Sequence, residues 1–291
     1  MNRRELLAGG IVGAAALALP SNVQAEQESN RKMHLGIVTY NVAKDWDLDT
    51  ILRNCHEAGI EGVEFRTTHA HGVEPALDAG KRAEVRKKCA DAGLLQTSLG
   101  STCEFQSDDS AEVRRNVETC REFVLLAKDI GARGVKVRPN GLPKDKSIPL
   151  EKTLEQIGKA LAECGQIGAD HGVEIWMEVH GPTTQLVPNA RKIMDFCGHK
   201  NVGVTWNSNN TDVNDAAHGS VKENVALLRP WIRCCHITEL WSSYPYRELF
   251  TLLNQTGYDR FTLCEIGSPI KAEDGATFLK CYKGLWKELS R

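Results

Sequence analysis

The stretch AKDIGARGVKVR, residues 127 to 138, joins the end of a predicted helix to a predicted strand. Gly131 directly follows Ile130, where the helical pattern stops, and glycine readily adopts the left-handed conformation that ends many helices. The residues that follow it, GVKVR (134–138), have the β-branched character of a strand. A glycine at the end of a helix is typical of the short loops that join a helix to the next strand in α/β folds. Three more glycines lie just past predicted helices: Gly59, Gly93 and Gly172.

Eight β-rich segments alternate with amphipathic patterns such as the one at residues 150–164, where apolar side chains recur at three- and four-residue steps. No glycine-rich phosphate loop follows the first segment, since the sequence there reads YNVAKDWD (40–47). This organisation favours a single-domain (β/α)₈ TIM barrel of the α/β class over a doubly wound sheet. The predicted strands are HLGIVTY (34–40), GVEFR (62–66), LLQTSL (94–99), GVKVR (134–138), VEIWMEV (173–179), VGVTW (202–206), IRCCH (232–236) and FTLCEI (261–266).

Composition and charge exclude some classes of function. The chain has 291 residues with 41% hydrophobic and 25% charged side chains and a net charge of −2, which is ordinary for a soluble globular enzyme. A chain with a net charge near zero gives no sign of the basic surface that binds nucleic acid, so we expect no nucleic-acid partner. The ten cysteines include no CxxC pair, and four of them fall on predicted helices. We therefore expect mostly buried free thiols, as in a protein that folds in a reducing compartment.

Residues 1–25 have the features of an export signal. Arg3 and Arg4 precede the apolar segment LLAGGIVGAAALAL, and small residues end it at Ala25. Paired arginines suggest the twin-arginine route and a periplasmic location, with residues 26–32 as a linker and 33–291 as the barrel. An uncleaved N-terminal anchor is the alternative for residues 1–25. The rest of the sequence contains no apolar run of about 20 residues, so we expect no stable membrane span in the mature chain.

Four polar residues mark the ends of the last four predicted strands: Glu178, Asn207, His236 and Glu265. Each follows the previous one by 29 residues, and each has the side-chain parity that faces the barrel interior, together with Trp176, Thr205, Cys234 and Leu263. Because a TIM barrel gathers strand ends at one rim, we expect the four side chains to converge. Two carboxylates, an imidazole and an amide oxygen would suit one divalent ion: Mn²⁺, Mg²⁺, Co²⁺ or Zn²⁺.

These residues carry a resemblance to a known family. The order Glu, Asn, His, Glu on strands five to eight resembles the order Glu, Asp, His, Glu of the sugar phosphate isomerase/epimerase family, xylose isomerase-like barrels that include ketose 3-epimerases. The likeness spans residues 33–291 and is most specific in WMEVHG, TWNSNNTDV, CCHITEL and LCEIGSP. Asn207 stands where that family usually has aspartate, and Asn210 where it often has histidine. A neutral amide at residue 207 lowers the negative charge of the ligand set by one.

The resemblance implies a mechanism in which Glu178 and Glu265 act as an acid/base pair and also hold the metal. The ion would polarise a carbonyl, and the carboxylates would remove and return the proton on the neighbouring carbon. His180 could contact a substrate hydroxyl. Asn210, after strand six, is a further candidate substrate-binding residue. Others lie at the ends of strands two to four or in the loops after them: Arg66, His69, His71, Glu104, Lys136 and Arg138. For Lys136 the alternative is a structural bridge to Glu64.

Three functions remain open from the sequence. The first is a metal-dependent isomerase or epimerase acting on a sugar or keto-sugar, and the second is a lyase that cleaves a 3-keto-glycoside by β-elimination at the same residues. The third is a non-catalytic sugar-binding barrel. An endonuclease-type relative would need several zinc ions, more rim histidines and a basic face for DNA. The expected partner is a small-molecule sugar or keto-glycoside, with a homo-oligomer possible.

Overall fold

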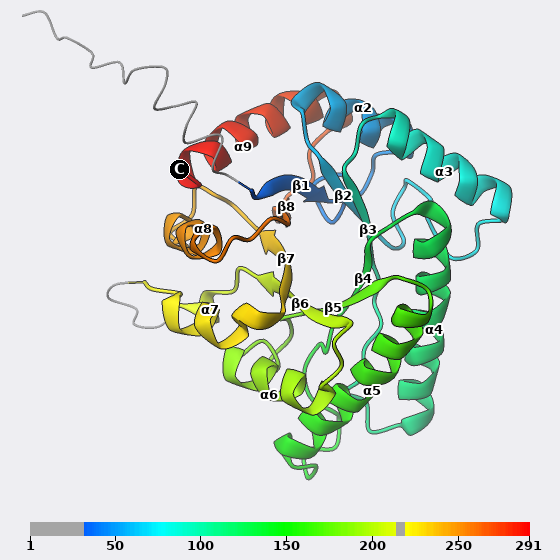
Figure 1. Cartoon of the computed structure of the whole chain (residues 1–291), viewed down its shortest axis with the longest axis vertical. Helices are drawn as coiled ribbons and strands as arrows, with labels where there is room; N and C mark the ends of the chain where they lie inside the picture. The colour runs from blue at the N-terminus through cyan, green and yellow to red at the C-terminus, as the bar shows by residue number, and fades with distance from the viewer. Residues whose placement is uncertain (1–31, 214–218) are drawn as a thin grey trace, which may run out of the picture. The chain divides into compact units, whose positions relative to one another are not determined.

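The structure is a computed structural model that describes residues 32–213 and 219–291, and residues 32–291 form one compact unit. The predicted signal (1–25) and nearly all of the linker (26–32) lie outside the described residues. Eight parallel strands close into a barrel in the order β1 to β8, and helices surround it (Figure 1). The predicted TIM barrel is confirmed. Across the described residues, none of the helices has both the length and the apolar character needed to span a lipid bilayer.

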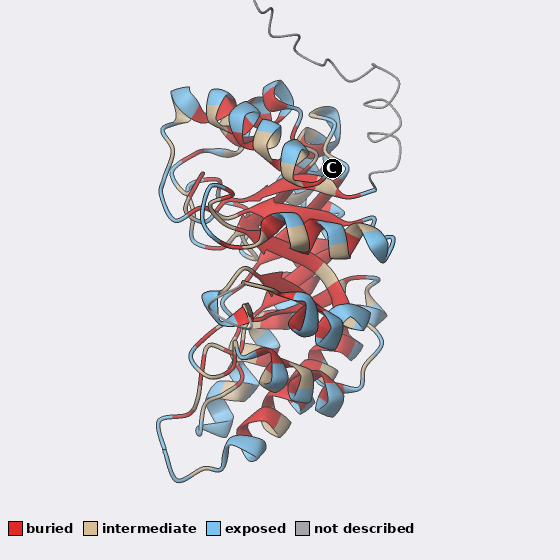
Figure 2. Cartoon of the chain, turned by 90° about the vertical axis from the view of Figure 1, so that its left-hand side faces the viewer, coloured by how far each residue is buried: buried red, intermediate tan, exposed pale blue. Residues whose placement is uncertain are grey.

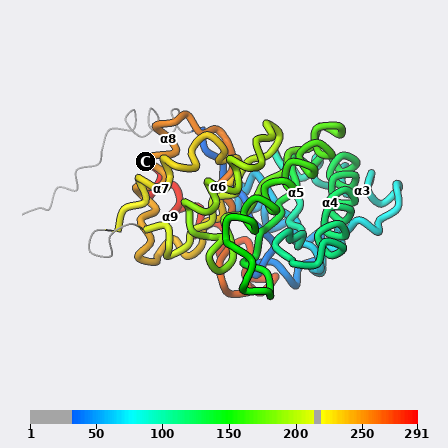
Figure 3. Tube along the Cα trace, turned by 90° about the horizontal axis from the view of Figure 1, so that it is seen from below, coloured from blue at the N-terminus to red at the C-terminus, as the bar shows by residue number. Residues whose placement is uncertain are grey.

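All eight predicted strands are present, with ends that differ from the expected ones by at most two residues. Figure 3 shows the helices from α3, α4 and α5 on one side of the unit to α7, α8 and α9 on the other. The strands are β1 (His34–Val38), β2 (Gly62–Arg66), β3 (Gln96–Gly100), β4 (Gly134–Val137), β5 (Glu174–Glu178), β6 (Val202–Asn207), β7 (Ile232–Ile237) and β8 (Phe261–Cys264). The helices are α2 (Leu48–Ala58), α3 (Ala79–Asp91), α4 (Ser110–Ile130), α5 (Leu150–Asp170), α6 (Val187–Cys197), α7 (Lys222–Leu228), α8 (Tyr246–Gln255) and α9 (Gly275–Leu289), with short 3₁₀ turns η1 (Asn210–Asp212), η2 (Arg229–Trp231) and η3 (Ala272–Asp274).

The predicted glycine junctions have the expected conformation. Gly59 and Gly131 have φ angles of 64° and 76°, and their N–H groups bond to carbonyls in the last turns of α2 and α4. Gly93 and Gly172, just beyond α3 and α5, also have positive φ, at 77° and 70°. Each glycine therefore ends its helix in the left-handed region, which a side chain with a Cβ enters only at a cost.

Two apolar cores lie on opposite sides of the strands. The larger one packs the helices onto the outer face of the barrel, and the strands are buried between them (Figure 2). The smaller one fills the barrel interior and consists of Val38, Trp176, Cys234, Phe261 and Leu263. Because alternate residues of a strand face opposite sides, the residues two positions after Trp176, Cys234 and Leu263 lie above this inner core, at the carboxyl ends of the strands.

The cysteines follow the predicted pattern. All ten are free thiols, and nine of them are buried, Cys281 being the exposed one. Burial raises the pKa of Cys55 and Cys234 well above the ordinary value and that of Cys89 to about 12. These thiols are therefore apolar packing groups rather than nucleophiles at neutral pH.

Candidate active site

His236 lies at the centre of a cluster of polar side chains above the inner core. It precedes the last residue of β7, and its side chain is fully buried. Its Nδ1 is 3.2 Å from Glu265 Oε2 and 3.6 Å from Glu178 Oε1. Burial acts to lower the pKa of His236, but the charges of Glu265 and Glu64 outweigh it and raise this pKa well above the ordinary value. The structure thus brings together three of the four residues predicted as metal ligands.

Glu178, the last residue of β5, is paired with Lys136. The Lys136 ammonium on β4 donates a 2.8 Å hydrogen bond to Glu178 Oε2, and both side chains are only 4% exposed. Burial acts to raise the pKa of Glu178, but Lys136 and His236 hold it well below the usual range. The structural alternative named a bridge from Lys136 to Glu64, and the structure corrects the partner to Glu178. A buried ammonium needs a carboxylate within contact distance, and here the neighbouring strand supplies it.

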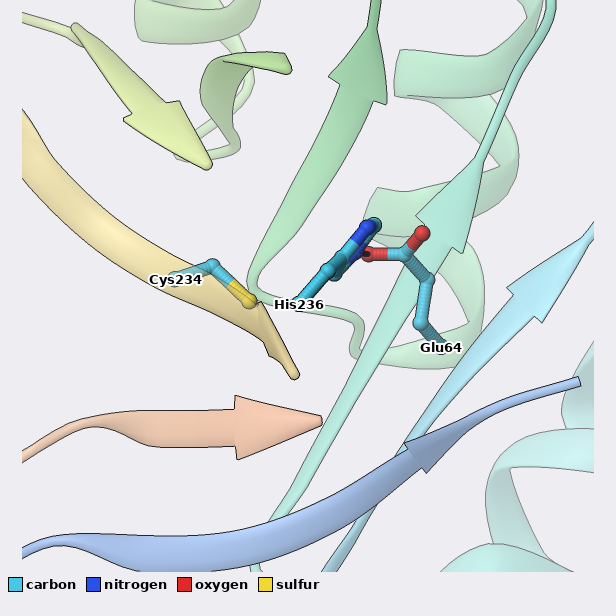
Figure 4. A group of neighbouring side chains, drawn as sticks. All are labelled: Glu64, Cys234 and His236. Carbon is cyan, nitrogen blue, oxygen red and sulfur yellow. Dashed lines mark hydrogen bonds and ion pairs between the residues drawn. The ribbon is translucent and has the colours of Figure 1, made fainter. Parts of the chain in front are cut away.

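Glu64 on β2 contacts the other side of His236. Its Oε2 is 3.4 Å from His236 Nε2, and its Oε1 has no hydrogen-bond partner although it is buried. Figure 4 shows the Glu64 carboxylate beside the imidazole, with Cys234 coming from the same strand as His236. When the imidazole is neutral, a carboxylate that accepts the Nε2 proton leaves the Nδ1 lone pair directed at Glu178 and Glu265, which is how second carboxylates orient metal-binding histidines. Sequence reasoning assigned Glu64 no such role, and its interior parity was the only available signal.

Two further observations concern the surroundings of Glu64. Gly100 on β3 leaves room for its carboxylate, because a Cβ at Gly100 would stand 2.8 Å from Glu64 Oε1. The ligand-capable atoms of Glu64, Cys234 and His236 lie within 4.8 Å of one another. Cys234, however, packs in the apolar inner core, and burial keeps its thiol protonated. This second group is therefore better described as support for His236 than as a separate metal site.

Asn207 ends β6 and lies within the cluster, with 8% of its surface exposed. Its Nδ2 donates a 3.3 Å hydrogen bond to Glu178 Oε1. The prediction had Asn207 ligating through its carbonyl oxygen, but the structure turns the amino group toward Glu178. Ligation through Oδ1 requires a half-turn of the amide, which a cation bound to Glu178 would favour because it repels the N–H group.

The side chains present fit a divalent ion. His236 Nδ1 is buried without a hydrogen-bond partner, which is costly unless a proton or a cation satisfies it. The ligand-capable atoms of Glu178, His236 and Glu265 all lie within 4.8 Å of one another. Carboxylates and imidazole together suit Mn²⁺, Co²⁺ or Zn²⁺. Glu178, His236 and Glu265 would hold such an ion, with Asn207 as a fourth ligand after rotation.

The predicted substrate-binding histidines differ in how many of their ring nitrogens lack a hydrogen-bond partner. His180, two residues beyond Glu178, is partly exposed, and its Nδ1 is buried without a partner. His71 accepts a hydrogen bond from Val73 N–H at Nδ1 and bonds to the Arg66 carbonyl through Nε2. Both of its ring nitrogens are engaged by the backbone, so His71 shapes the loop after β2 and leaves neither nitrogen for a substrate. His69 bonds through Nδ1 to Thr39 and keeps its other nitrogen available.

Two other predicted substrate-binding residues, Glu104 and Asn210, differ in their surroundings. Glu104 pairs with Arg138 at 3.0 Å and also accepts bonds from Asn140 and Gln106, so both of its oxygens are occupied. Contact between Glu104 and substrate stays a prediction. Asn210 is exposed in η1, and the buried polar residue of that turn is Asp212, which the sequence did not single out.

Comparisons with known proteins agree with this architecture. A family model described as a xylose isomerase-like TIM barrel matches residues 52–282. An L-ribulose 3-epimerase of Mesorhizobium japonicum is 24% identical over 260 residues, covering 83% of each chain.

Several solved structures share the fold. A structure of L-ribulose 3-epimerase has a TM-score of 0.71 and 19% identity, covering 89% of this chain and 96% of the other. The IOLI protein with a bound zinc atom has a TM-score of 0.72 and 17% identity, covering 89% and 98%. The 3-keto-D-glucoside 4-epimerase YcjR of E. coli has a TM-score of 0.70 and 16% identity, covering 88% and 99%. These relatives include epimerases, and another structure of the same fold is a probable 3-DHS dehydratase, which is consistent with an enzyme.

Proposed function

Because the chain belongs to the xylose isomerase-like TIM barrel family, we propose that it is a metal-dependent isomerase or epimerase of a ketose or another keto-sugar. The observation that carries the proposal is the convergence of Glu178, His236 and Glu265: the buried Nδ1 of His236 makes no hydrogen bond and stands 3.2 Å and 3.6 Å from two carboxylates. When bound, a divalent ion would polarise the substrate carbonyl and stabilise negative charge that develops on its oxygen.

The two glutamates have different surroundings and hence different roles. Glu178 is held by Lys136 and His236 with a pKa well below the usual range, so its carboxylate is a weak proton acceptor. Glu265 lies just beyond β8, is 14% exposed on its side chain, and is not paired with a lysine or arginine among the described residues. We assign Glu265 as the base that takes the proton from the carbon next to the carbonyl. Lys136 and Glu178 form the pair on the other side that returns a proton.

A lyase at the same residues is the second candidate. Elimination needs an acid that protonates the departing oxygen, and the buried Lys136 ammonium, 2.8 Å from Glu178, is such a donor. Isomerisation or epimerisation conserves the mass of the substrate, whereas β-elimination splits a keto-glycoside into two products. Mass spectrometry of the products therefore separates the two candidates.

The test of proton abstraction uses exchange with solvent. A ketose is incubated with metal-loaded enzyme in D₂O, and loss of its α-proton signal is followed by NMR. Excess chelator should stop the exchange, and Mn²⁺ or Co²⁺ should restore it. Glu265→Gln should retain metal and slow the exchange by about 10²–10⁴-fold, the usual effect of losing a positioned base. Exchange at the wild-type rate in chelator would exclude the metal-dependent mechanism, and wild-type exchange in Glu265→Gln would exclude Glu265 as the base.

We also propose that the enzyme is exported to the periplasm with residues 1–25 as a twin-arginine signal. All ten cysteines are free thiols, which suits a chain that folds in a reducing compartment before transport. Replacing Arg3 and Arg4 with lysine should retain the precursor in the cytoplasm, as measured by fractionation and intact mass. Periplasmic material that still carries residues 1–25 would contradict cleavage.

A further inference from the structure

Arg66, the last residue of β2, has a half-buried guanidinium with no carboxylate partner. It has the same parity as Glu64, so its side chain starts on the interior side of the barrel mouth. Its Nη1 donates to the Thr67 carbonyl at 2.7 Å and more distantly to Thr68 Oγ1. Within residues 32–213 and 219–291, no carboxylate oxygen lies at ion-pair distance from Arg66, and Nε and Nη2 have no hydrogen-bond partner.

The free edge of this guanidinium has the geometry that binds anions. Nε–H and Nη2–H point in parallel, and such a pair binds a carboxylate or phosphate through two hydrogen bonds. Burial and then the charge of Arg138 lower the pKa of Arg66, so the cation has lost solvent next to a like charge. Glu178 and Glu64 act in the opposite direction, but from beyond contact distance. A partly desolvated cation of this kind is stabilised by an anion that bonds to it directly.

Arg138, the other arginine at this rim, already has its counter-charge. Its Nη2 and Nε lie 3.0 Å and 3.1 Å from Glu104 Oε1. Asn140 and Gln106 hold the same carboxylate in place. Of these two neighbouring arginines, Arg66 is therefore the one with donors left for a ligand.

A hydrogen-bond chain fixes a second donor beside Arg66. His71 Nδ1 accepts from Val73 N–H at 3.0 Å, so the ring carries its proton on Nε2 and donates it to the Arg66 carbonyl. Thr39 Oγ1 accepts from Arg66 N–H at 2.9 Å and can donate its hydroxyl proton to His69 Nδ1, 3.0 Å away. In that arrangement His69 carries its own proton on Nε2. Burial, followed by the charges of His71 and Arg66, lowers the pKa of His69 to about 4, so this neutral N–H donor persists at neutral pH.

Tyr40 gives this region an aromatic surface. The tyrosine is 43% exposed, its ring stacks on His69 with centroids 6.0 Å apart, and the Arg66 Cζ lies 5.6 Å from its centroid. Tyr40 and His69 follow β1 and β2, so the surface lies on the same end of the barrel as the ligand cluster. A guanidinium edge, a neutral N–H and an aromatic ring together suit a sugar that carries an acidic group.

We propose that Arg66, with His69 and Tyr40, forms a subsite for an anionic group of the substrate, namely the carboxylate of a keto-sugar acid. The inference rests on the proposed function, because the reacting carbonyl is placed at Glu178 and Glu265. A carboxylate has two coplanar oxygens, which match the two parallel N–H groups of the free Arg66 edge. Phosphate could nevertheless use the same donors, and the experiment separates the two.

The test compares three ketoses that differ at C6 alone. D-Fructose, D-fructuronate and D-fructose 6-phosphate are titrated into the metal-loaded enzyme, and dissociation constants are measured by calorimetry. The wild type should bind fructuronate about ten- to a hundredfold more tightly than fructose, as a bidentate charge-assisted pair provides. Equal affinity for fructose and fructuronate in the wild type overturns the subsite. Tighter binding of the phosphate that depends on Arg66 supports the subsite and assigns it to sugar phosphates.

Matched variants show whether Arg66 is responsible. Arg66→Gln should abolish the preference for fructuronate over fructose, and Arg66→Lys should restore part of that preference, since lysine keeps the charge without the fork. Arg133→Gln, exposed at the opposite end of β4, removes the same charge and should change nothing. A preference that survives in Arg66→Gln, or falls equally in Arg133→Gln, refutes the role of Arg66. Metal content and the unfolding midpoint of each variant serve as folding controls.

The outcomes distinguish this subsite from the proposed function. Solvent exchange of the fructose α-proton without any preference for fructuronate would leave the isomerase or epimerase intact and remove the subsite. Tight, Arg66-dependent fructuronate binding without proton exchange would keep the subsite and remove the chemistry.

Discussion

Replacing Asn207 with aspartate should tighten metal binding and make the metal-free protein less stable. In the structure the Asn207 amide donates to Glu178 Oε1 at 3.3 Å. The substitution replaces this attraction with two facing carboxylates, whose repulsion at that distance is on the order of 5 kcal/mol at an effective dielectric constant of about 20. Lys136 and proton uptake offset part of it, so we expect a net loss of about 1–3 kcal/mol in the free energy of unfolding. A bound divalent ion replaces the repulsion with attraction, and its dissociation constant should fall at least about tenfold.

The assay is thermal unfolding in chelator and in a series of Mn²⁺ concentrations. Asn207→Asp should unfold a few degrees below the wild type in chelator and gain more than the wild type as Mn²⁺ is added, because ligand stabilisation follows the ratio of ligand concentration to dissociation constant. Asn210→Asp is the control, since it adds the same charge to an exposed residue of the next turn. If Mn²⁺ raises the midpoint by the same amount in all three proteins, Asn207 does not lie beside the ion and the reasoning fails.

Two other substitutions test the packing around Glu64 and the protonation of Asp212. Gly100→Ala places a Cβ 2.8 Å from Glu64 Oε1, so it should lower the free energy of unfolding by about 1–3 kcal/mol, as measured by denaturant unfolding. Because Glu64 contacts His236, the substitution should also weaken Mn²⁺ binding, as measured by calorimetry. Wild-type values in both measurements would show that the carboxylate moves aside freely. Burial raises the pKa of Asp212 to about 7, so the folded state keeps a proton that the unfolded state loses near pH 4, and stability falls as pH rises between these values. Asp212→Asn keeps the bonds from Tyr244 and the Asn209 N–H, so its stability relative to the wild type should rise from pH 4 to pH 8, by up to about 4 kcal/mol. A difference that does not change with pH in urea unfolding would mean that Asp212 is ionised throughout.

The interior position of Glu178, His236 and Glu265 followed from the sequence because strand parity is a local property. Trp176, Cys234 and Leu263 pack inside the barrel, and the residues two positions later extend that face toward the rim. The left-handed glycines after the helices could also be predicted from the sequence, since their conformation depends on the backbone preferences of single residues. These local rules determined the barrel and the convergence of Glu178, His236 and Glu265.

The partner of each polar group was decided only by the tertiary structure. Lys136 pairs with Glu178 rather than Glu64, and Glu64 reaches His236, which lies 172 residues away in the sequence. The amino group of Asn207 turns toward Glu178 for the same reason, because these contacts depend on the tilt and stagger of strands in the closed barrel. Parity tells which side a side chain faces, but not how far it lies from a side chain across the interior. Distances of about 3 Å between charged groups show that Glu178 pairs with Lys136, that Glu64 contacts the histidine, and that Arg66 has no carboxylate partner among the described residues.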